Sequence, residues 1–137
     1  MDSVLIDSDV ILDFLFDREP FAEFASEIIT LCDKKKILGY TTPVIISNVY
    51  YLLNRVSKHE VVVQKIKELL QIIDIISIDK PTIIEALNSK FKDFEDGIQN
   101  YAAENTNSIT IILTRNIKDY QHSKLGVFSP EMYLKNK

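Results

Sequence analysis

The chain has 137 residues, of which 46% are hydrophobic, and a formal net charge of −4. This length can bury one sizeable core but is too short for two ordinary domains, so we expect a single domain over residues 1–137. Cys32 is the only cysteine, which excludes an intramolecular disulfide, and with only His59 and His122 a usual Cys/His zinc site is excluded as well. The negative charge argues against a surface that binds nucleic acid nonspecifically over its whole extent.

The chain carries no recognisable targeting or membrane segment. Its N-terminal stretch lacks a basic region followed by an apolar one, and no apolar run approaches the ~18 residues needed to span a bilayer. It also has no internal repeat, no low-complexity segment and no linker rich in Gly, Ser or Pro. We therefore expect a soluble, cytoplasmic protein without a membrane association or an internal domain boundary.

The first predicted strand is the apolar run Val4–Ile6, which suits a strand buried on both faces of a parallel sheet. Carboxylates follow at once. Ligands of open α/β sheets bind just outside the carboxyl ends of such strands, so Asp7 has the position of a functional residue. Ser8 or Asp9 could instead cap a helix that begins at Val10, and for Asp9 the capping and the functional interpretation stay open.

Helices and strands are predicted to alternate along the rest of the chain. A helix opened by Pro20 should end at Lys34–Lys36, where the lysines suit the negative end of the helix dipole. After a short strand at 39–42, the apolar helix from Pro43 to about Arg55 should be buried on more than one side. The remaining elements are a helix capped by Ser57 and Glu60, a strand at 75–78, a short helix through Leu87, a helix from about Asp93, strands at 109–113 and 127–128, and a final helix capped by Ser129.

This alternation predicts βαβ units with right-handed crossovers. The expected fold class is therefore α/β, a three-layer α/β/α sandwich with a mainly parallel central sheet of four to five strands. Polar residues follow or flank several of these strands: Asp7, Ser47, Asn48, Asp96, Asn116 and Asp119. All of them could lie at the carboxyl edge of the one sheet.

Clustered carboxylates at such an edge repel one another, and a divalent cation holds them together most readily. Mg²⁺ and Mn²⁺ take oxygen ligands and often use one or two protein carboxylates together with phosphate oxygens of a substrate. Such a site can activate a water and neutralise the charge that develops at phosphorus. The pattern therefore favours hydrolysis of a phosphodiester.

An ordered set of motifs spans almost the whole chain, in the segments 5–13, 18–21, 46–53, 93–99, 114–120 and 128–134. These motifs resemble those of PIN-domain proteins, close to the ribonuclease toxins of the VapC type. The ordered set is far more specific than any one motif. It implies a PIN-like fold and an endoribonuclease that depends on Mg²⁺ or Mn²⁺, with RNA as substrate, a cognate antitoxin as partner and a homodimeric state.

Carried over residue by residue, the resemblance implies catalytic and metal-binding roles for Asp7, Asp96 and Asp119, with Asn116 as a further metal ligand. Asn48 stands where most PIN nucleases have Glu, and Asn116 where many have Asp. An amide oxygen can ligate a cation, but it brings no charge and cannot serve as a general base. Asp9 replaces the Asn that is common at its position, which returns one charge nearby.

Two further groups of residues are expected around these acids. The polar residues that should support the site are Ser8, Asp9, Ser47, Asn48 and Thr114. The cations that should contact RNA phosphates are Arg18, Arg115 and Lys118.

Two other functions stay open at this point. A PIN domain without turnover could work as an RNA-binding or protein-interaction module, in which Arg18, Arg115, Lys118 and Lys124 would hold phosphates without cleavage. The first motif also resembles that of haloacid-dehalogenase-like phosphatases, with Asp7 as nucleophile and Asp9 as acid. That family needs a later pair of acids after a strand, and the pair Glu95–Asp96 does not follow one.

Overall fold

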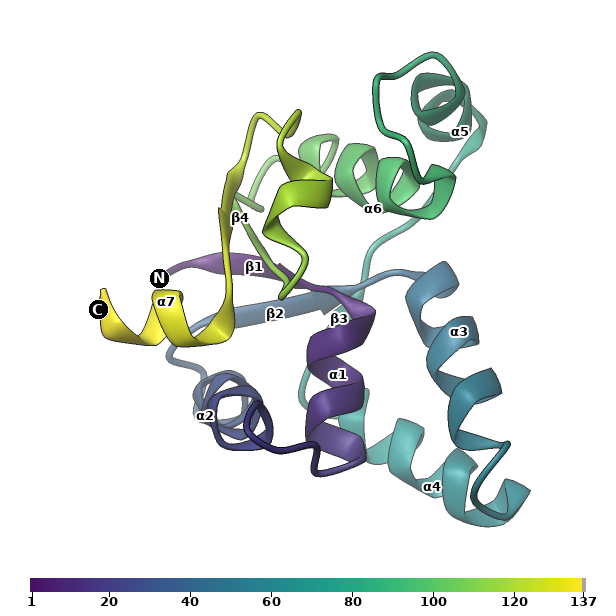
Figure 1. Cartoon of the computed structure of the whole chain (residues 1–137), viewed down its shortest axis with the longest axis vertical. Coiled ribbons are helices and arrows are strands. Elements are labelled where there is room, and N and C mark those ends of the chain that lie inside the picture. The colour runs from purple at the N-terminus through teal and green to yellow at the C-terminus, as the bar shows by residue number, and fades with distance from the viewer. Residues whose placement is uncertain (137) are drawn as a thin grey trace.

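The computed structural model describes residues 1–136. Within this range five parallel strands form one sheet in the order β3-β2-β1-β4-β5, between two layers of helices (Figure 1). The strands are β1 (Ser3–Ile6), β2 (Leu38–Thr41), β3 (Asp74–Ile75), β4 (Ile111–Leu113) and β5 (Gly126–Phe128). The predicted three-layer α/β/α fold with a mainly parallel sheet of four to five strands is confirmed.

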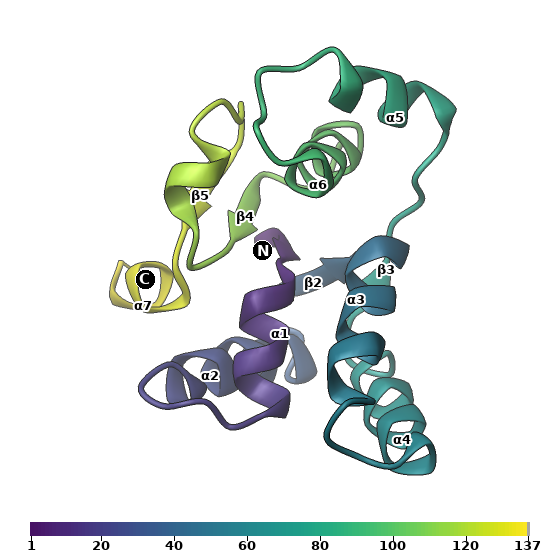
Figure 2. The same ribbon diagram turned by 45° about the vertical axis from the view of Figure 1, so that its right-hand side comes forward.

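The helices divide between the two faces of the sheet (Figures 1 and 2). The lower layer contains α1 (Ser8–Leu15), α2 (Ala22–Asp33), α3 (Pro43–Leu53) and α4 (His59–Leu69), and α7 (Pro130–Lys135) packs against α2. The upper layer contains α5 (Lys80–Leu87) and α6 (Phe94–Glu104), with the 3₁₀ helix η1 (Ile117–Tyr120) beside α6. None of the helices in residues 1–136 has the length and apolarity needed to cross a membrane.

The central strand β1 explains why the chain opens on an uninterrupted apolar run. Val4 and Ile6 pack into the larger core cluster, which includes side chains of α1, α2 and α3, whereas Leu5 packs into the cluster that includes side chains of α6. Successive side chains of a strand point to opposite faces, so a strand covered on both sides needs apolar residues at every position. All three side chains are fully buried, as predicted.

The start of α2 differs from the prediction. This helix begins at Ala22 rather than at Pro20, because the backbone N–H groups of Phe21 and Ala22 donate to the Arg18 carbonyl and form a turn before the helix. Its end agrees with the prediction, since Lys34 is the C-cap residue.

The capping box predicted from Ser57 and Glu60 is wrong. The N-cap of α4 is Lys58, which makes no hydrogen bond from its side chain to the first turn. The strand predicted at 75–78 is shorter in the structure and begins one residue earlier, since β3 spans Asp74–Ile75. After the Ile76 N–H bonds to the Thr41 carbonyl, the chain leaves the edge of the sheet and turns toward α5.

Helix α3 is buried on one side, not on several as its apolar sequence suggested. Ile45, Val49 and Leu53 are at most 2% exposed and follow one another at the spacing of a single helix face. Tyr51 on the opposite face is 60% exposed. Apolar composition alone therefore overstated the burial of this helix.

Candidate functional site

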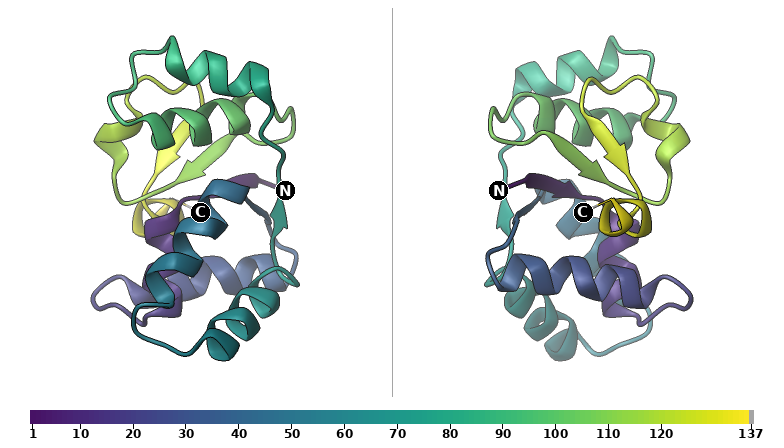
Figure 3. Two further views of the ribbon diagram at one scale, coloured as in Figure 1. Left: turned by 90° about the vertical axis from the view of Figure 1, so that its right-hand side faces the viewer. Right: turned by 90° about the vertical axis from the view of Figure 1, so that its left-hand side faces the viewer.

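The register between β1 and β4 brings Asp7 and Thr114 together at the carboxyl edge of the sheet, which faces the viewer in the left panel of Figure 3. The Asp7 N–H donates to the Leu113 carbonyl at 3.0 Å, and the Thr114 hydroxyl donates to Asp7 Oδ2 at 2.8 Å. Asp7 is 5% exposed and Thr114 is fully buried. The carboxylate thus points inward and is held from the neighbouring strand.

Asp7 is also the N-cap of α1. Its Oδ1 accepts a hydrogen bond from the Ser8 N–H at 2.8 Å, and its backbone is extended, as an N-cap requires. The helix therefore begins at Ser8, two residues earlier than predicted, and the cap expected from Ser8 or Asp9 comes from Asp7. Asp9 instead accepts from the Arg115 N–H at 2.9 Å through its Oδ2.

Asp96 reaches the same edge from the first turn of α6. Asp93 caps this helix by accepting from the Asp96 N–H at 3.0 Å. The half-buried Asp96 side chain faces Tyr120 of η1, whose hydroxyl donates to Asp96 Oδ1 at 3.4 Å. Burial and the nearby charges of Asp7 and Asp96 raise the pKa of Tyr120 far above its usual value, so it remains a donor. Sequence reasoning missed Tyr120, and its place directly after Asp119 was the available signal.

The acids form one electrostatic group. Burial, and then the negative charge of Asp9, raises the pKa of Asp7 to about 6. Burial also raises the pKa of Asp96 to about 7, with further contributions from the charges of Asp7, Asp93 and Asp119. Each carboxylate therefore resists ionisation because its neighbours are acidic and water is partly excluded.

The donor set at this edge fits a hard divalent cation. All the donors are oxygens, and Asp9 Oδ1 is buried without a hydrogen-bond partner, which leaves a carboxylate oxygen in need of a cation or a proton donor. Across residues 1–136, no three Asp, Glu, His or Cys side chains already converge into a complete metal cage. Asp7 and Asp96 with water and substrate oxygens match the usual Mg²⁺ arrangement, which uses one or two protein carboxylates.

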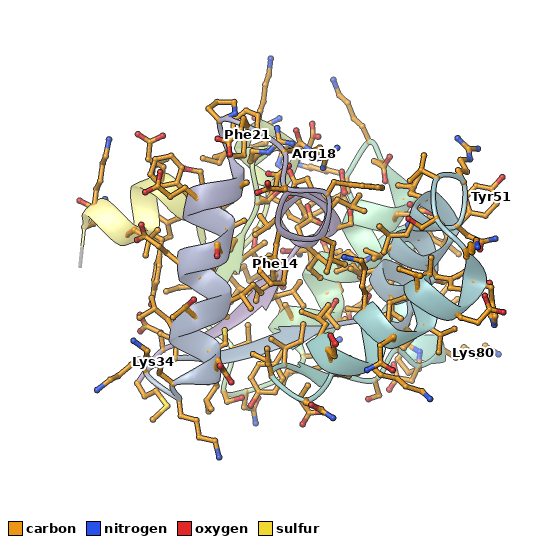
Figure 4. All side chains as sticks on the ribbon, turned by 90° about the horizontal axis from the view of Figure 1, so that it is seen from below. Phe14, Arg18, Phe21, Lys34, Tyr51 and Lys80 are labelled. Carbon is orange, nitrogen blue, oxygen red and sulfur yellow. The ribbon has the colours of Figure 1, made fainter. Side chains whose placement is uncertain are left out.

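Asp13 at the end of α1 binds two arginines that the sequence suggested as phosphate contacts. Its carboxylate is 1% exposed and accepts from Arg115 Nε at 2.6 Å, from Arg115 Nη2 at 3.1 Å and from Arg18 Nε at 2.9 Å. The Arg115 guanidinium also lies 3.9 Å from the centre of the Phe21 ring. Figure 4 shows Arg18 and Phe21 at the end of α1, with Lys34 at the other end of α2.

This clasp of Asp13, Arg18 and Arg115 joins α1, the loop before α2 and the loop after β4. The backbone N–H of Arg115 also donates to Asp9, so Arg115 positions two acids of α1, Asp9 and Asp13. The structure thus gives both arginines a structural role in addition to the phosphate contact expected from the sequence. Sequence reasoning included Asp13 in the first motif but assigned it no role, because its partner Arg115 lies 102 positions away.

The two asparagines expected near the acids, Asn48 and Asn116, lie in different surroundings. Asn48 Nδ2 donates to Glu95 Oε2 at 3.0 Å, which ties α3 to the first turn of α6 and adds a carboxylate that sequence reasoning had not placed at the site. Ser47, its neighbour, is exposed. Asn116 is exposed as well, and its backbone N–H donates to the Thr114 hydroxyl at 3.1 Å.

Asp119 and Lys118 lie on η1, and both are exposed. They line one groove with Asp96 and Asp93. The structure therefore brings Asp7, Asp96 and Asp119 to one edge of the sheet, with Lys118 beside them.

Comparisons with known proteins agree on one family. A family model described as "PIN domain" matches residues 3–118. The chain is 26% identical over 137 residues to Ribonuclease VapC1 of Aquifex aeolicus (strain VF5), an alignment that covers 96% of this chain and 93% of that protein.

Solved structures show the same fold. A toxin–antitoxin complex from Klebsiella pneumoniae contains a chain that matches with a TM-score of 0.69 at 19% identity, over 93% of this chain and 97% of that one. Mycobacterium tuberculosis VapC20, described as a sarcin–ricin loop cleaving toxin, matches with a TM-score of 0.66 at 13% identity, over 87% of this chain and 94% of that one. These matches give no support to the phosphatase alternative.

Proposed function

The chain belongs to the PIN-domain family, and from this membership and the geometry of its acidic edge we propose that it is a divalent-metal-dependent endoribonuclease. Its resemblance to VapC-type ribonuclease toxins is confirmed at the level of the family. The observation that carries the proposal is the meeting of Asp7 and Asp96, which come from distant parts of the chain and both face the Tyr120 hydroxyl. The charge of Asp7 also raises the pKa of Asp96.

In this proposal Asp7 and Asp96 hold Mg²⁺ or Mn²⁺. Asp119 and the amide oxygen of Asn116 are further oxygen ligands at the same edge of the sheet. A bound cation of this type lowers the pKa of a coordinated water and neutralises the charge that develops at phosphorus. Thr114 holds Asp7 in place by donating a hydrogen bond to its carboxylate. The exposed Asp119 carboxylate can accept a hydrogen bond from a water that approaches the phosphate.

The test is a cleavage assay with a pool of structured and unstructured RNAs, with and without Mn²⁺ or Mg²⁺. We expect metal-dependent cleavage by the unmodified protein and its loss in Asp7→Asn and Asp96→Asn, because each change removes a charge from the proposed cation site. Asp33→Asn, at an exposed position at the end of α2, is the matched control and should leave cleavage unchanged. Cleavage that survives both site variants would overturn the assignment.

A PIN domain without turnover is the second candidate, and the amides at positions 48 and 116 favour it. Asn48 contributes no charge and already donates its amide to Glu95. This candidate predicts salt-sensitive RNA binding without cleavage at any concentration of either cation. The same assay, extended to a binding measurement, therefore separates the two functions.

We also propose a cognate antitoxin as the protein partner, a homodimeric state and a cytoplasmic location. The antitoxin is supported by the toxin–antitoxin complexes among the structural relatives. The dimer and the location rest on the family resemblance.

A further inference from the structure

Beside the acidic edge lies a groove of about 370 Å³ between the loop before α6 and η1. Its volume is within the ~300–1,000 Å³ range of pockets that hold small ligands. The half-buried Asp96 and the exposed Asp119 line it, so the groove adjoins the proposed site of hydrolysis. The cations in its lining are Lys90, Lys92 and Lys118, and His122 lies among them.

The three lysines are exposed and carry unpaired charges. In the part of the chain that the structure describes, none of their side chains forms an ion pair or a hydrogen bond, whereas Arg18 and Arg115 are bound to Asp13. Asp93, Asp96 and Asp119 also line the groove, so the three lysines offset three acids in its lining. A cation bound at Asp96 and Asp119, as proposed above, would neutralise these carboxylates and leave the unpaired lysines to attract an anion. Lysine binds phosphate as a mobile point charge and needs no fixed geometry.

The groove also presents an aromatic ring in a supported position. His122 is exposed, and its ring meets Phe91 edge to face with their centres 6.2 Å apart. Phe91 in turn contacts the rings of Tyr101 and Tyr120, at 5.8 and 6.0 Å. The His122 ring is therefore backed by a packed aromatic cluster.

The loop that carries Lys90 and Lys92 is held in shape as well. Ser89 Oγ donates to the Ala86 carbonyl at 2.8 Å and accepts from the Phe91 N–H at 3.2 Å. These bonds fix the turn between α5 and the following loop, on which the lysines lie. The groove wall is therefore formed before any ligand binds, which lowers the entropic cost of binding.

We propose that this groove binds the RNA segment next to the cleaved phosphodiester, with backbone phosphates on Lys90, Lys92 and Lys118 and one unpaired base stacked on His122. Lysines that follow a backbone, together with an aromatic ring that accepts a base, are the usual combination for single-stranded nucleic acid. This inference rests on the proposed ribonuclease function. It adds the residues that select an unpaired strand.

Binding is tested by fluorescence anisotropy with a labelled single-stranded RNA and a duplex of the same sequence, in the Asp7→Asn background with Mg²⁺ so that cleavage does not interfere. We expect Lys90→Gln/Lys92→Gln to weaken single-strand binding about tenfold and to lower the salt slope by about 0.7 per lysine. His122→Ala should weaken it at least about fivefold, and His122→Phe should restore it, since stacking contributes ~1–3 kcal/mol per base. Duplex binding should not respond to the His122 variants.

Lys34→Gln/Lys35→Gln is the matched control, because these lysines are equally exposed and lie at the end of α2, below the sheet (Figures 1 and 4). In the otherwise unmodified protein, the groove variants should raise KM for single-stranded RNA and leave kcat within about twofold. Metal-dependent cleavage with an unchanged KM in these variants would overturn the proposal that the groove binds RNA and would leave the nuclease assignment intact. Groove-dependent binding without cleavage by the unmodified protein would overturn the nuclease assignment and support the groove.

Discussion

The surroundings of Asp7 act on its protonation in opposite directions. As the N-cap of α1 and the acceptor from Thr114, its carboxylate is held by two donors that stabilise the ionised form. Burial and the charge of Asp9 outweigh these bonds, since the pKa of Asp7 is raised to about 6. The ionised Asp7 side chain therefore lowers the stability of the fold when no cation is bound.

This balance predicts how Asp7→Asn changes stability with pH. A carboxyl whose pKa is higher in the folded than in the unfolded state destabilises the fold as pH rises from about 4 to about 6, because the folded protein binds the extra proton. Without cation, Asp7→Asn should therefore gain about 2 kcal/mol of unfolding free energy relative to the unmodified protein between pH 4.5 and 7.5. Asn keeps the helix cap, so the fold is retained.

Urea denaturation of both proteins at the two pH values measures this difference. The Asp96 carboxyl adds to it in the same direction, because the variant removes the Asp7 charge that raises the pKa of Asp96. Asp33→Asn, at the exposed end of α2, should show no such change. A stability difference between Asp7→Asn and the unmodified protein that is the same at both pH values would contradict the prediction.

At the scale of elements, α1 organises the site through its own side chains. Asp7 caps it, Asp9 accepts from the Arg115 N–H, and Asp13 at its far end holds the side chains of Arg115 and Arg18. The loop after β4 is thus attached to α1 at two residues, Asp9 and Asp13. These bonds hold Thr114 and η1 close to the end of β1.

The clasp predicts a large cost for Asp13→Asn. The change removes the negative charge that two arginines share, and Asp13 is 1% exposed, so little water can replace it. We expect a loss of about 2–3 kcal/mol in unfolding free energy, below the ~3–5 kcal/mol of a fully buried pair because the arginines reach solvent.

Asp17→Asn is the matched control for this change, since Asp17 is exposed nearby in a left-handed conformation (φ 54°) that Asn also adopts. It should cost less than about 0.5 kcal/mol. Chemical denaturation measures both variants. Equal stabilities of Asp13→Asn and the unmodified protein would show that the clasp contributes nothing.

At the scale of the whole molecule, the acidic edge predicts that stabilisation by a divalent cation depends on pH. Protons compete with a cation for Asp7 and Asp96, whose pKa values lie at about 6 and about 7. The increase in melting temperature caused by Mg²⁺ or Mn²⁺ should therefore be clearly larger at pH 8 than at pH 5. Thermal unfolding at constant ionic strength measures it.

The double variant Asp7→Asn/Asp96→Asn is the control for this cation effect and should lose most of it at pH 8, because both proposed ligands lose their charge. Equal shifts at the two pH values in the unmodified protein would show that the cation binds elsewhere.

Local sequence patterns were enough to predict the fold class and the position of the candidate site in the fold. Val4–Ile6 predicted a strand buried on both faces, and Asp7 directly after it predicted an acid at the carboxyl edge. Asp93 and Ser129 were predicted as helix starts and are N-caps. These features depend on neighbours within a few residues, which is why the sequence alone reveals them.

The partners of these residues were decided by tertiary structure. Thr114 meets Asp7 across 107 positions through strand register, and Arg115 meets Asp13 across 102 positions. Tyr120 reaches Asp96 because η1 packs beside α6. Such contacts depend on register and packing between distant segments, and no local pattern specifies them. The sequence alone thus indicated an acidic edge, and the fold determined which donors hold each carboxylate and which lysines stay unpaired beside it.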